Sequence, residues 1–255
     1  MTWTLIGEAA SPWSEKARWA LDHHRLAYAY REHYPLIGEL SLRLRARGLK
    51  GRVSTPMLLT PEGPLIDSFR IARYADAHGS APTLFPAEHA EEIAAWNARS
   101  EAALGAARVR YLDRLANDRA AKLEQQPPAF PGFVRQLSVP AVDFAMAFLR
   151  RKYGMPDSTA AEATLVLELE ALQHALAGGK RHLVADRLTY ADLAMAVTLQ
   201  FVSPVDGEHL ALGPATRAAG VHPQLSARYP DIVAWRDALY ARHRRSDQPA
   251  EPVRA

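Results

Sequence analysis

The spacing of hydrophobic residues changes along the chain and divides it into two parts. In residues 1–78, short apolar runs alternate with stretches in which apolar residues recur at helical spacing. Short apolar or alternating runs predict strands, and apolar residues three or four positions apart predict amphipathic helices. The strands are predicted at residues 2–7, 26–31, 56–60 and 64–66, and the helices at about 15–22, 36–47 and 68–78. This order, βαβαββα, indicates an α/β domain.

After residue 78 the pattern is helical. Residues 79–87, GSAPTLFPA, contain several helix breakers and predict a linker. Apolar stripes typical of a buried helix face follow at Ile93, Trp96, Leu104, Tyr111 and Leu115, at Leu165, Leu169, Leu172 and Leu176, and at Ile232, Trp235 and Leu239. A Pro-rich loop at 125–132 precedes a further helix, expected at 139–153. We therefore expect an α/β domain at 1–78, a linker at 79–87, an all-α domain at 88–243 and a disordered tail at 244–255.

The composition narrows the class of protein. An apolar share of 48% and a charged share of 23% in 255 residues are ordinary for a soluble globular protein. No run is long enough to span a membrane, and the N-terminus lacks the order of a signal peptide, so we expect a cytoplasmic protein. The net charge is +3, and the one dense basic cluster, at 242–245, is expected to be a solvated terminus rather than a nucleic-acid site. The absence of cysteine excludes disulfides, zinc–thiolate centres and thiol–disulfide exchange.

The segment Ser11-Pro12-Trp13-Ser14 lies between the first predicted strand and the first predicted helix. Ser11 is therefore expected at a helix N-terminus, beside unpaired backbone N–H groups and the positive end of the helix dipole. Serine followed by proline is also an ordinary way to begin a helix. The position suits stabilisation of an anion, and a thiolate is an anion.

Two further segments fit the same site. Thr55-Pro56 begins the third predicted strand, and Asp67-Ser68 joins the fourth strand to a helix. The order and spacing of these three segments resemble the glutathione-binding domain of the cytosolic glutathione transferase superfamily. The resemblance covers residues 2–243 and implies a thioredoxin-like domain of the Ser type followed by an all-α domain.

The resemblance assigns roles to individual residues. Ser11 would donate a hydrogen bond to the thiolate of glutathione, with Ser14 as an alternate donor or support. Pro56 would be a cis-proline that turns the backbone of Thr55 toward the cysteinyl part of glutathione, and Asp67 and Ser68 would hold the γ-glutamyl group. Arg52 or Lys50 would bind the glycine carboxylate, although this chain lacks the lysine or glutamine that commonly stands beside the proline.

The acceptor would lie between the Ser11 loop and the first long helix of the second domain. Trp13, Arg99, Arg108 and Tyr111 are the candidates for its wall, with Arg99 also interpretable as a surface arginine. The sequence has no obvious general base for this site, which is consistent with a reaction driven by thiolate formation and proximity. No metal is expected.

Several activities are compatible with these residues. The leading hypothesis is a detoxifying enzyme that conjugates glutathione to an electrophilic small molecule. The alternatives are a glutathione-dependent isomerase, a dehalogenase or ether-cleaving enzyme, and a non-catalytic binding protein of the same fold. The resemblance also implies a homodimer, and it gives no reason to expect nucleic acid or a membrane as partner.

One motif in the second domain predicts stability rather than chemistry. Thr189 and Asp192 have the spacing of a capping box, in which the hydroxyl and the carboxylate each satisfy a backbone N–H at the start of a helix. Leu188, just before the cap, is positioned to pack on Leu193. Similar strings recur in the all-α domain of glutathione transferases, and we expect no catalytic role for Asp192.

Overall fold

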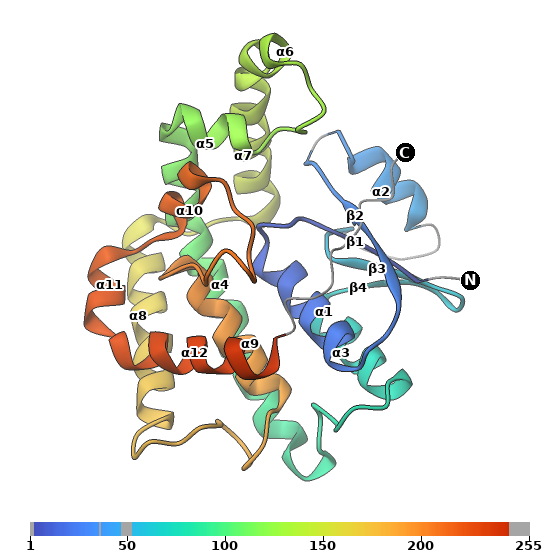
Figure 1. Ribbon diagram of the computed structural model, residues 1–255. Coiled ribbons are helices and arrows are strands. Elements are labelled where there is room, and N and C mark those ends of the chain that lie inside the picture. Colours follow the sequence, from blue (N-terminus) through green and yellow to red (C-terminus); the bar gives the residue numbers. More distant parts are fainter. Residues whose placement is uncertain (1–2, 36, 47–52, 245–255) are drawn as a thin grey trace.

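The computed structural model describes residues 3–35, 37–46 and 53–244. The N-terminal domain follows the predicted order βαβαββα (Figure 1). Its elements are β1 (Trp3–Gly7), α1 (Pro12–His23), β2 (Tyr28–Glu32), α2 (Glu39–Arg45), β3 (Met57–Thr60), β4 (Gly63–Ile66) and α3 (Ser68–His78). The strand order is β2-β1-β3-β4, with β1 parallel to β2 and antiparallel to β3. This is the thioredoxin-like α/β architecture expected.

Alternation along the central strands determines which helix covers which face of the sheet. Leu5 of β1 pairs with Leu58 of β3, and both pack with α1, α3 and the helical domain. Their neighbours Ile6 and Met57 point to the opposite face and pack with Leu42 of α2. Because side chains of a strand alternate between faces, one apolar run supplies both cores. α2 is shorter than the predicted helix at about 36–47, of which residues 36 and 47 lie outside the described residues.

The second domain is helical (Figure 1). It consists of η1 (Ala87–His89), α4 (Ala90–Asn117), α5 (Arg119–Glu124), α6 (Gly132–Leu137), α7 (Val139–Tyr153), α8 (Ser158–Ala175), α9 (Tyr190–Thr198), η2 (Leu199–Phe201), α10 (Pro214–Gly220), α11 (Pro223–Arg228) and α12 (Pro230–His243). The long helix α4 packs against α8 and α9. The three predicted apolar stripes lie on α4, α8 and α12, whereas α6, α10 and α11 were not predicted because they are only six or seven residues long.

The capping box is present at the start of α9. The Asp192 carboxylate accepts the backbone N–H of Thr189 at 2.8 Å, the Thr189 hydroxyl at 3.0 Å and the backbone N–H of Leu183 at 2.7 Å. Asp192 and Thr189 are both fully buried. The motif therefore ties the loop before α9 to the helix start, as the sequence predicted.

The end of α12 corrects one expectation. Arg244, predicted to begin a disordered tail, is buried: its Nε donates to Glu15 at 2.7 Å and its Nη1 to Asp22 at 2.6 Å, both on α1. Buried carboxylates on α1 need a cationic partner, and Arg244 supplies it from the far end of the chain. The boundary of the folded chain thus extends beyond residue 243, and residues 245–255 lie outside the described residues.

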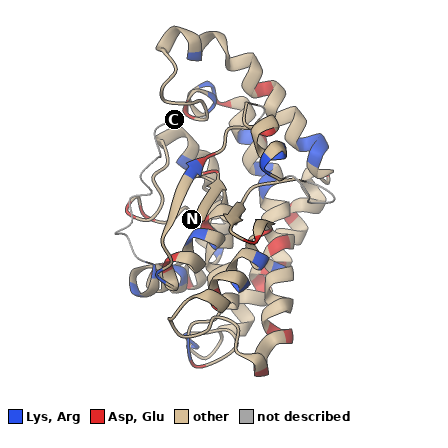
Figure 2. Ribbon diagram, turned by 90° about the vertical axis from the view of Figure 1, so that its right-hand side faces the viewer, with Lys and Arg blue, Asp and Glu red and all other residues tan. Residues whose placement is uncertain are grey.

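Charged residues of both signs are interspersed over the two domains (Figure 2). Within the described part of the chain, no helix is both long and apolar enough to cross a membrane. Among the same residues, no group of three or more histidine, aspartate or glutamate side chains is arranged to hold a metal ion.

Candidate active site

A cleft of about 1010 Å³ lies between the two domains and receives almost all of the site residues predicted from the sequence. From the N-terminal domain it is lined by Ser11, Trp13, Thr55, Pro56, Asp67 and Ser68. From the helical domain it is lined by Arg108 and Tyr111 of α4, together with residues of the segment between α4 and α7. Ligand pockets commonly have volumes of about 300–1,000 Å³, so this cleft has room for glutathione and a second molecule.

Ser11 stands at the N-cap of α1, as predicted. Its side chain makes no capping hydrogen bond, and proline follows at the first helical position. The hydroxyl therefore remains available at a helix N-terminus, where backbone N–H groups and the helix dipole favour a negative charge. Ser14, in contrast, is fully buried, and its Oγ accepts the backbone N–H of Glu8 at 3.0 Å. It does not line the cleft.

The two backbone features expected beside Ser11 are present. The Thr55–Pro56 peptide bond is cis, and Pro56 precedes β3. Asp67 is the N-cap of α3 and adopts φ +87°, a region that residues other than glycine seldom occupy. Its carboxylate accepts the backbone N–H of Arg70 at 3.0 Å, while the side chain as a whole is exposed. Such a backbone outlier typically costs about 1–3 kcal/mol and is concentrated at functional sites.

Arg108 of α4 stacks with aromatic rings of both domains at the cleft. The guanidinium of Arg108 lies 4.8 Å from the centre of the Trp13 ring and 3.9 Å from the centre of the Tyr153 ring. Tyr111 lies further along α4 and packs against Phe201, with ring centres 4.7 Å apart. Burial raises the pKa of Tyr111 above its ordinary value, so its hydroxyl remains protonated and can donate a hydrogen bond.

Arg99, like Ser14, falls outside this arrangement, and two further candidates lie outside the described residues. Arg99 does not line the cleft: it pairs with Glu168 of α8 at 2.7 Å, and its guanidinium lies 5.6 Å from the Trp96 ring. The offset of nine residues between Arg99 and Arg108 turns Arg99 to another side of α4, so its interpretation as a surface arginine is the one that the structure bears out. Arg52 and Lys50, proposed for the glycine carboxylate, lie outside the described residues.

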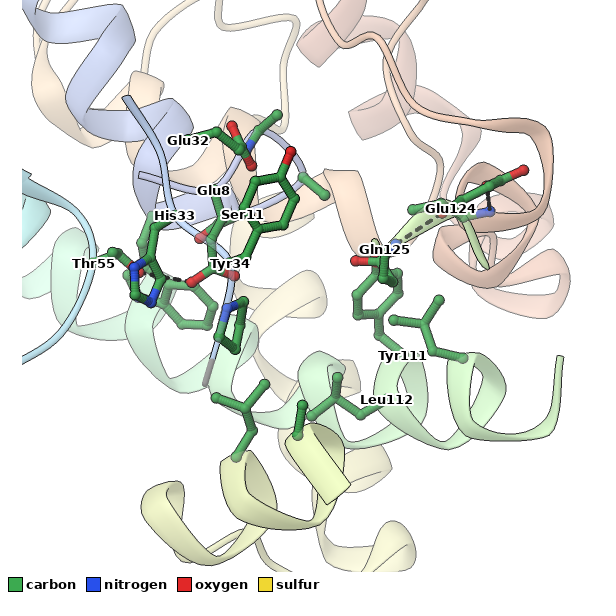
Figure 3. Close-up of a pocket in the computed structure, with 18 of the residues that line it drawn as sticks. Glu8, Ser11, Glu32, His33, Tyr34, Thr55, Tyr111, Leu112, Glu124 and Gln125 are labelled. Atoms are coloured by element: carbon green, nitrogen blue, oxygen red, sulfur yellow. Dashed lines mark hydrogen bonds between the residues drawn. The ribbon is translucent and has the colours of Figure 1, made fainter. Parts of the chain in front are cut away.

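Two carboxylates at the site were not anticipated from the sequence. Glu101 of α4 accepts the Trp13 indole N–H at 2.6 Å and the fully buried Lys16 ammonium at 2.8 Å, and so fixes α1 against the helical domain. Glu8, in the turn after β1, lines the cleft and accepts the Thr55 hydroxyl at 2.8 Å (Figure 3). Nothing local in the sequence distinguishes Glu8 from any acid after a strand, because its burial depends on residues far along the chain.

Beyond Tyr111 the cleft becomes more apolar. Leu112 and Leu115 of α4 line it together with Val142, Ala145 and Leu149 of α7, and Val142 and Leu149 pack against the cluster that contains the two leucines. At its far end, the carboxylate of Glu124 accepts the backbone N–H groups of Ala215 and Thr216 at 3.1 and 2.7 Å, and so caps α10 (Figure 3). The site thus combines a polar floor in the N-terminal domain with an apolar chamber in the helical one.

Comparisons with known proteins agree with this architecture. The family model for the glutathione S-transferase N-terminal domain matches residues 5–83, and that for the C-terminal domain matches residues 140–243. The chain belongs to the glutathione transferase superfamily. A comparison with curated protein sequences gives no match.

Solved structures with the same fold include bacterial and fungal proteins. A glutathione S-transferase from Methylobacillus flagellatus, with glutathione bound, has 17% identity and a TM-score of 0.59, covering 99% of this chain and 100% of its own. One from Methylobacterium radiotolerans, in complex with glutathione sulfonate, has 18% identity and a TM-score of 0.60, covering 95% and 92%. A glutathione transferase from Phanerochaete chrysosporium has 17% identity and a TM-score of 0.62, covering 97% and 100%.

Proposed function

We propose that this protein is a glutathione transferase. It binds glutathione on the polar floor of the cleft and joins it, through its sulfur, to an electrophile held in the apolar chamber. The observation that carries the proposal is the convergence of Ser11, the Thr55–Pro56 segment and Asp67, which has a positive φ, on one cleft. The similar bacterial structures that contain glutathione or glutathione sulfonate support the choice of ligand.

Ser11 is the proposed donor to the glutathione thiolate. A free thiol has a pKa of about 8.5, so little thiolate exists at neutral pH. Each unit by which the pKa falls requires about 1.4 kcal/mol of differential stabilisation, which one charge-assisted hydrogen bond can provide. Ser14 is the weaker candidate because its hydroxyl is buried and already holds the Glu8 N–H.

The remaining contacts follow from the positions of polar groups on the floor. Thr55 lines the cleft, and its backbone would contact an extended peptide such as the cysteinyl part of glutathione. The carboxylate of Asp67 would accept the γ-glutamyl ammonium, and Ser68 at the N-terminus of α3 would bind the γ-glutamyl carboxylate. Arg52 remains our candidate for the glycine carboxylate.

The acceptor is expected to have an apolar body and a polarised group. Its body would contact Leu112, Leu115 and Leu149, whereas its polarised group would lie near Arg108 and Tyr111. Both are hydrogen-bond donors, and donors placed where negative charge develops stabilise the transition state. A homodimer remains an expectation from the family.

The decisive experiment compares Ser11→Ala with Ser14→Ala. Ser11→Ala should lower kcat for a generic aryl halide by about one to three orders of magnitude while glutathione affinity, measured by calorimetry, changes little. Ser14→Ala should chiefly lower stability, because it leaves the buried N–H of Glu8 without its acceptor. Full activity in Ser11→Ala together with loss in Ser14→Ala would reverse the assignment, and full activity in both would refute the hydroxyl mechanism.

A binding-only role is tested first on the wild-type protein. Retention on immobilised glutathione together with turnover of the aryl halide supports a transferase. Retention without turnover directs the search to isomerisation, dehalogenation or ether cleavage, each assayed with its own substrate. Failure to retain the protein, with no heat of glutathione binding, refutes the proposal.

A further inference from the structure

The turn after β1 carries a carboxyl group into the cleft beside the proposed thiolate donor. The Ser11 N–H donates to the Glu8 carbonyl at 3.0 Å, so these two residues lie at opposite ends of one tight turn. Both side chains line the cleft, as Figure 3 shows. Building on the proposed function, we propose that Glu8 accepts the proton of the glutathione thiol and returns it to the acceptor after the carbon–sulfur bond has formed.

Hydrogen bonds hold the Glu8 carboxyl in place. Its backbone N–H donates to the buried Oγ of Ser14, and its carboxylate accepts the Thr55 hydroxyl at 2.8 Å. Thr55 is the residue whose backbone is proposed to contact the cysteinyl part of glutathione. The Glu8 carboxyl group therefore lies between the start of β3, which would bind the cysteinyl part of glutathione, and the N-terminus of α1, which would bind its sulfur.

The charge state of Glu8 suits proton transfer near neutrality. Burial raises the pKa of Glu8 to about 7, and the nearby carboxylate of Glu32 acts in the same direction. The Thr55 hydrogen bond and the positive charges of Lys152 and Arg108 act against this shift. Tyr30 and Tyr111 also face Glu8, and its charge contributes to the raised pKa of each. A carboxyl group titrating near the working pH is an effective acid–base catalyst.

The reaction balances with Glu8 as proton carrier. The S–H bond breaks, and its proton passes to a carboxylate oxygen of Glu8. Because two neighbouring anions repel, the glutathione sulfur and the Glu8 carboxyl group together hold one proton rather than none. In an addition to an α,β-unsaturated carbonyl compound, sulfur bonds to the β-carbon and the electron pair moves to the enolate. The enolate then takes the proton from Glu8 at its α-carbon, which regenerates the carboxylate.

This cycle favours one class of acceptor. Addition to a polarised double bond consumes the thiol proton, whereas substitution on an aryl halide releases a halide ion and leaves the proton with Glu8 or the solvent. Glu8 is therefore expected to accelerate addition reactions more than substitution reactions.

The first test counts protons. Glutathione binding is measured at pH 7.5 by calorimetry in two buffers of different ionisation enthalpy, and bound thiolate is measured by its ultraviolet absorbance. The wild type should release well under one proton per thiolate formed, and Glu8→Gln close to one. S-methylglutathione, which has no thiol, controls for unrelated proton exchange. Glutamine can still accept the Thr55 hydroxyl, so Glu8→Gln removes the titration and preserves the hydrogen bond.

A control variant and the wild type itself both test this assignment. Glu32→Gln lowers the pKa of Glu8 but leaves its carboxyl group in place, so its proton count should stay well below that of Glu8→Gln. A count close to one in Glu32→Gln together with a wild-type count in Glu8→Gln overturns the assignment. A wild-type count of one per thiolate overturns it without any variant, whereas a wild type that forms no thiolate refutes the proposed function itself.

The second test compares two reactions. Glu8→Gln should lower kcat/KM for an α,β-unsaturated aldehyde by about 10²–10³-fold, and for an aryl halide by less than about tenfold. Thr55→Val, which removes the hydrogen bond but not the carboxyl group, should leave the ratio of the two kcat/KM values as it is in the wild type. An equal loss for both substrates in Glu8→Gln, or the same pattern in Thr55→Val, would make Glu8 a positioning residue and overturn the proposal.

Discussion

Two helices of this molecule, α9 and α3, each have an aspartate at their N-terminus, and the two carboxylates have different roles. At α9, Asp192 is fully buried and its two carboxylate oxygens accept three hydrogen bonds. At α3, Asp67 is exposed, accepts the backbone N–H of Arg70 and occupies φ +87°. A carboxylate that is buried and saturated stabilises a fold, whereas an exposed one on a strained backbone facing a cleft retains capacity for a ligand. Environment, rather than residue type, separates the structural acid from the binding acid.

Glu8 represents a third situation. It is partly buried like a structural acid, yet it lines the cleft like Asp67, and among the described residues its carboxylate accepts one side-chain hydrogen bond, from Thr55. Burial without a full set of donors raises its pKa to about 7. The three acids therefore differ in a way that separate measurements of binding, pH dependence and stability can resolve.

The largest effect is expected from Asp67→Asn. The amide keeps an oxygen to cap α3 but loses the charge that would pair with the γ-glutamyl ammonium. Bound glutathione would cover this pair, and truncating one partner of a covered charge pair typically costs about 2–5 kcal/mol. Calorimetry should show glutathione affinity falling accordingly, with the thermal midpoint nearly unchanged. Glu88→Gln, on the exposed turn η1, is the matched control and should bind as the wild type does. Equal affinities in Asp67→Asn and the wild type would remove Asp67 from the binding site.

Glu8 predicts a pH dependence of stability. Its folded-state pKa of about 7 lies above the ordinary value of 4.5, so the folded protein binds the proton more tightly than the unfolded chain. Stability should therefore fall as pH rises from about 4.5 to about 7, and level off above that. Glu8→Gln should lack this fall and be more stable at pH 8 by up to about 3 kcal/mol. Urea unfolding of both proteins across this range measures the difference; parallel curves would contradict the raised pKa.

Asp192→Asn should lower stability without touching binding. A single carbonyl oxygen cannot replace two carboxylate oxygens for three donors, and the amide group places N–H against N–H. The expected cost is about 1–2 kcal/mol, seen as a lower thermal midpoint with an unchanged KM for glutathione. Asp186→Asn, an exposed acid in the same loop, controls for charge. A shifted KM for glutathione at unchanged stability would place the capping box at the glutathione site and contradict its structural role.

The contrast among these acids was only partly accessible from the sequence. The capping box and the Asp67-Ser68 segment are local patterns, and so are the four strands and the long helices, which is why they were predicted. Glu8 depends on Thr55, 47 residues away, for its hydrogen bond. Arg244 depends on Glu15 and Asp22 across nearly the whole chain. Contacts of this kind are set by tertiary packing, which single-residue patterns do not encode.

Arg99 and Arg108 illustrate the same limit on one helix. Both are arginines of α4, yet one pairs with Glu168 on α8 and the other stacks on Trp13 in the cleft. Helical spacing shows that they point in different directions but not which direction faces the cleft. That choice is made by where α1 and α8 pack against α4.

The smallest expected effect is the most direct test of strain at Asp67. Glycine adopts φ +87° without the clash that a Cβ introduces, and replacing an N-cap aspartate by glycine costs only a few tenths of a kcal/mol. Relief of the backbone strain should outweigh the entropic cost of introducing glycine. Asp67→Gly should therefore raise the free energy of unfolding by about 0.5–1 kcal/mol. The same variant lacks the carboxylate, so it should bind glutathione as poorly as Asp67→Asn. A more stable protein that has lost affinity would show that the turn sacrifices stability for binding, whereas a less stable one would mean that the aspartate is there for the helix.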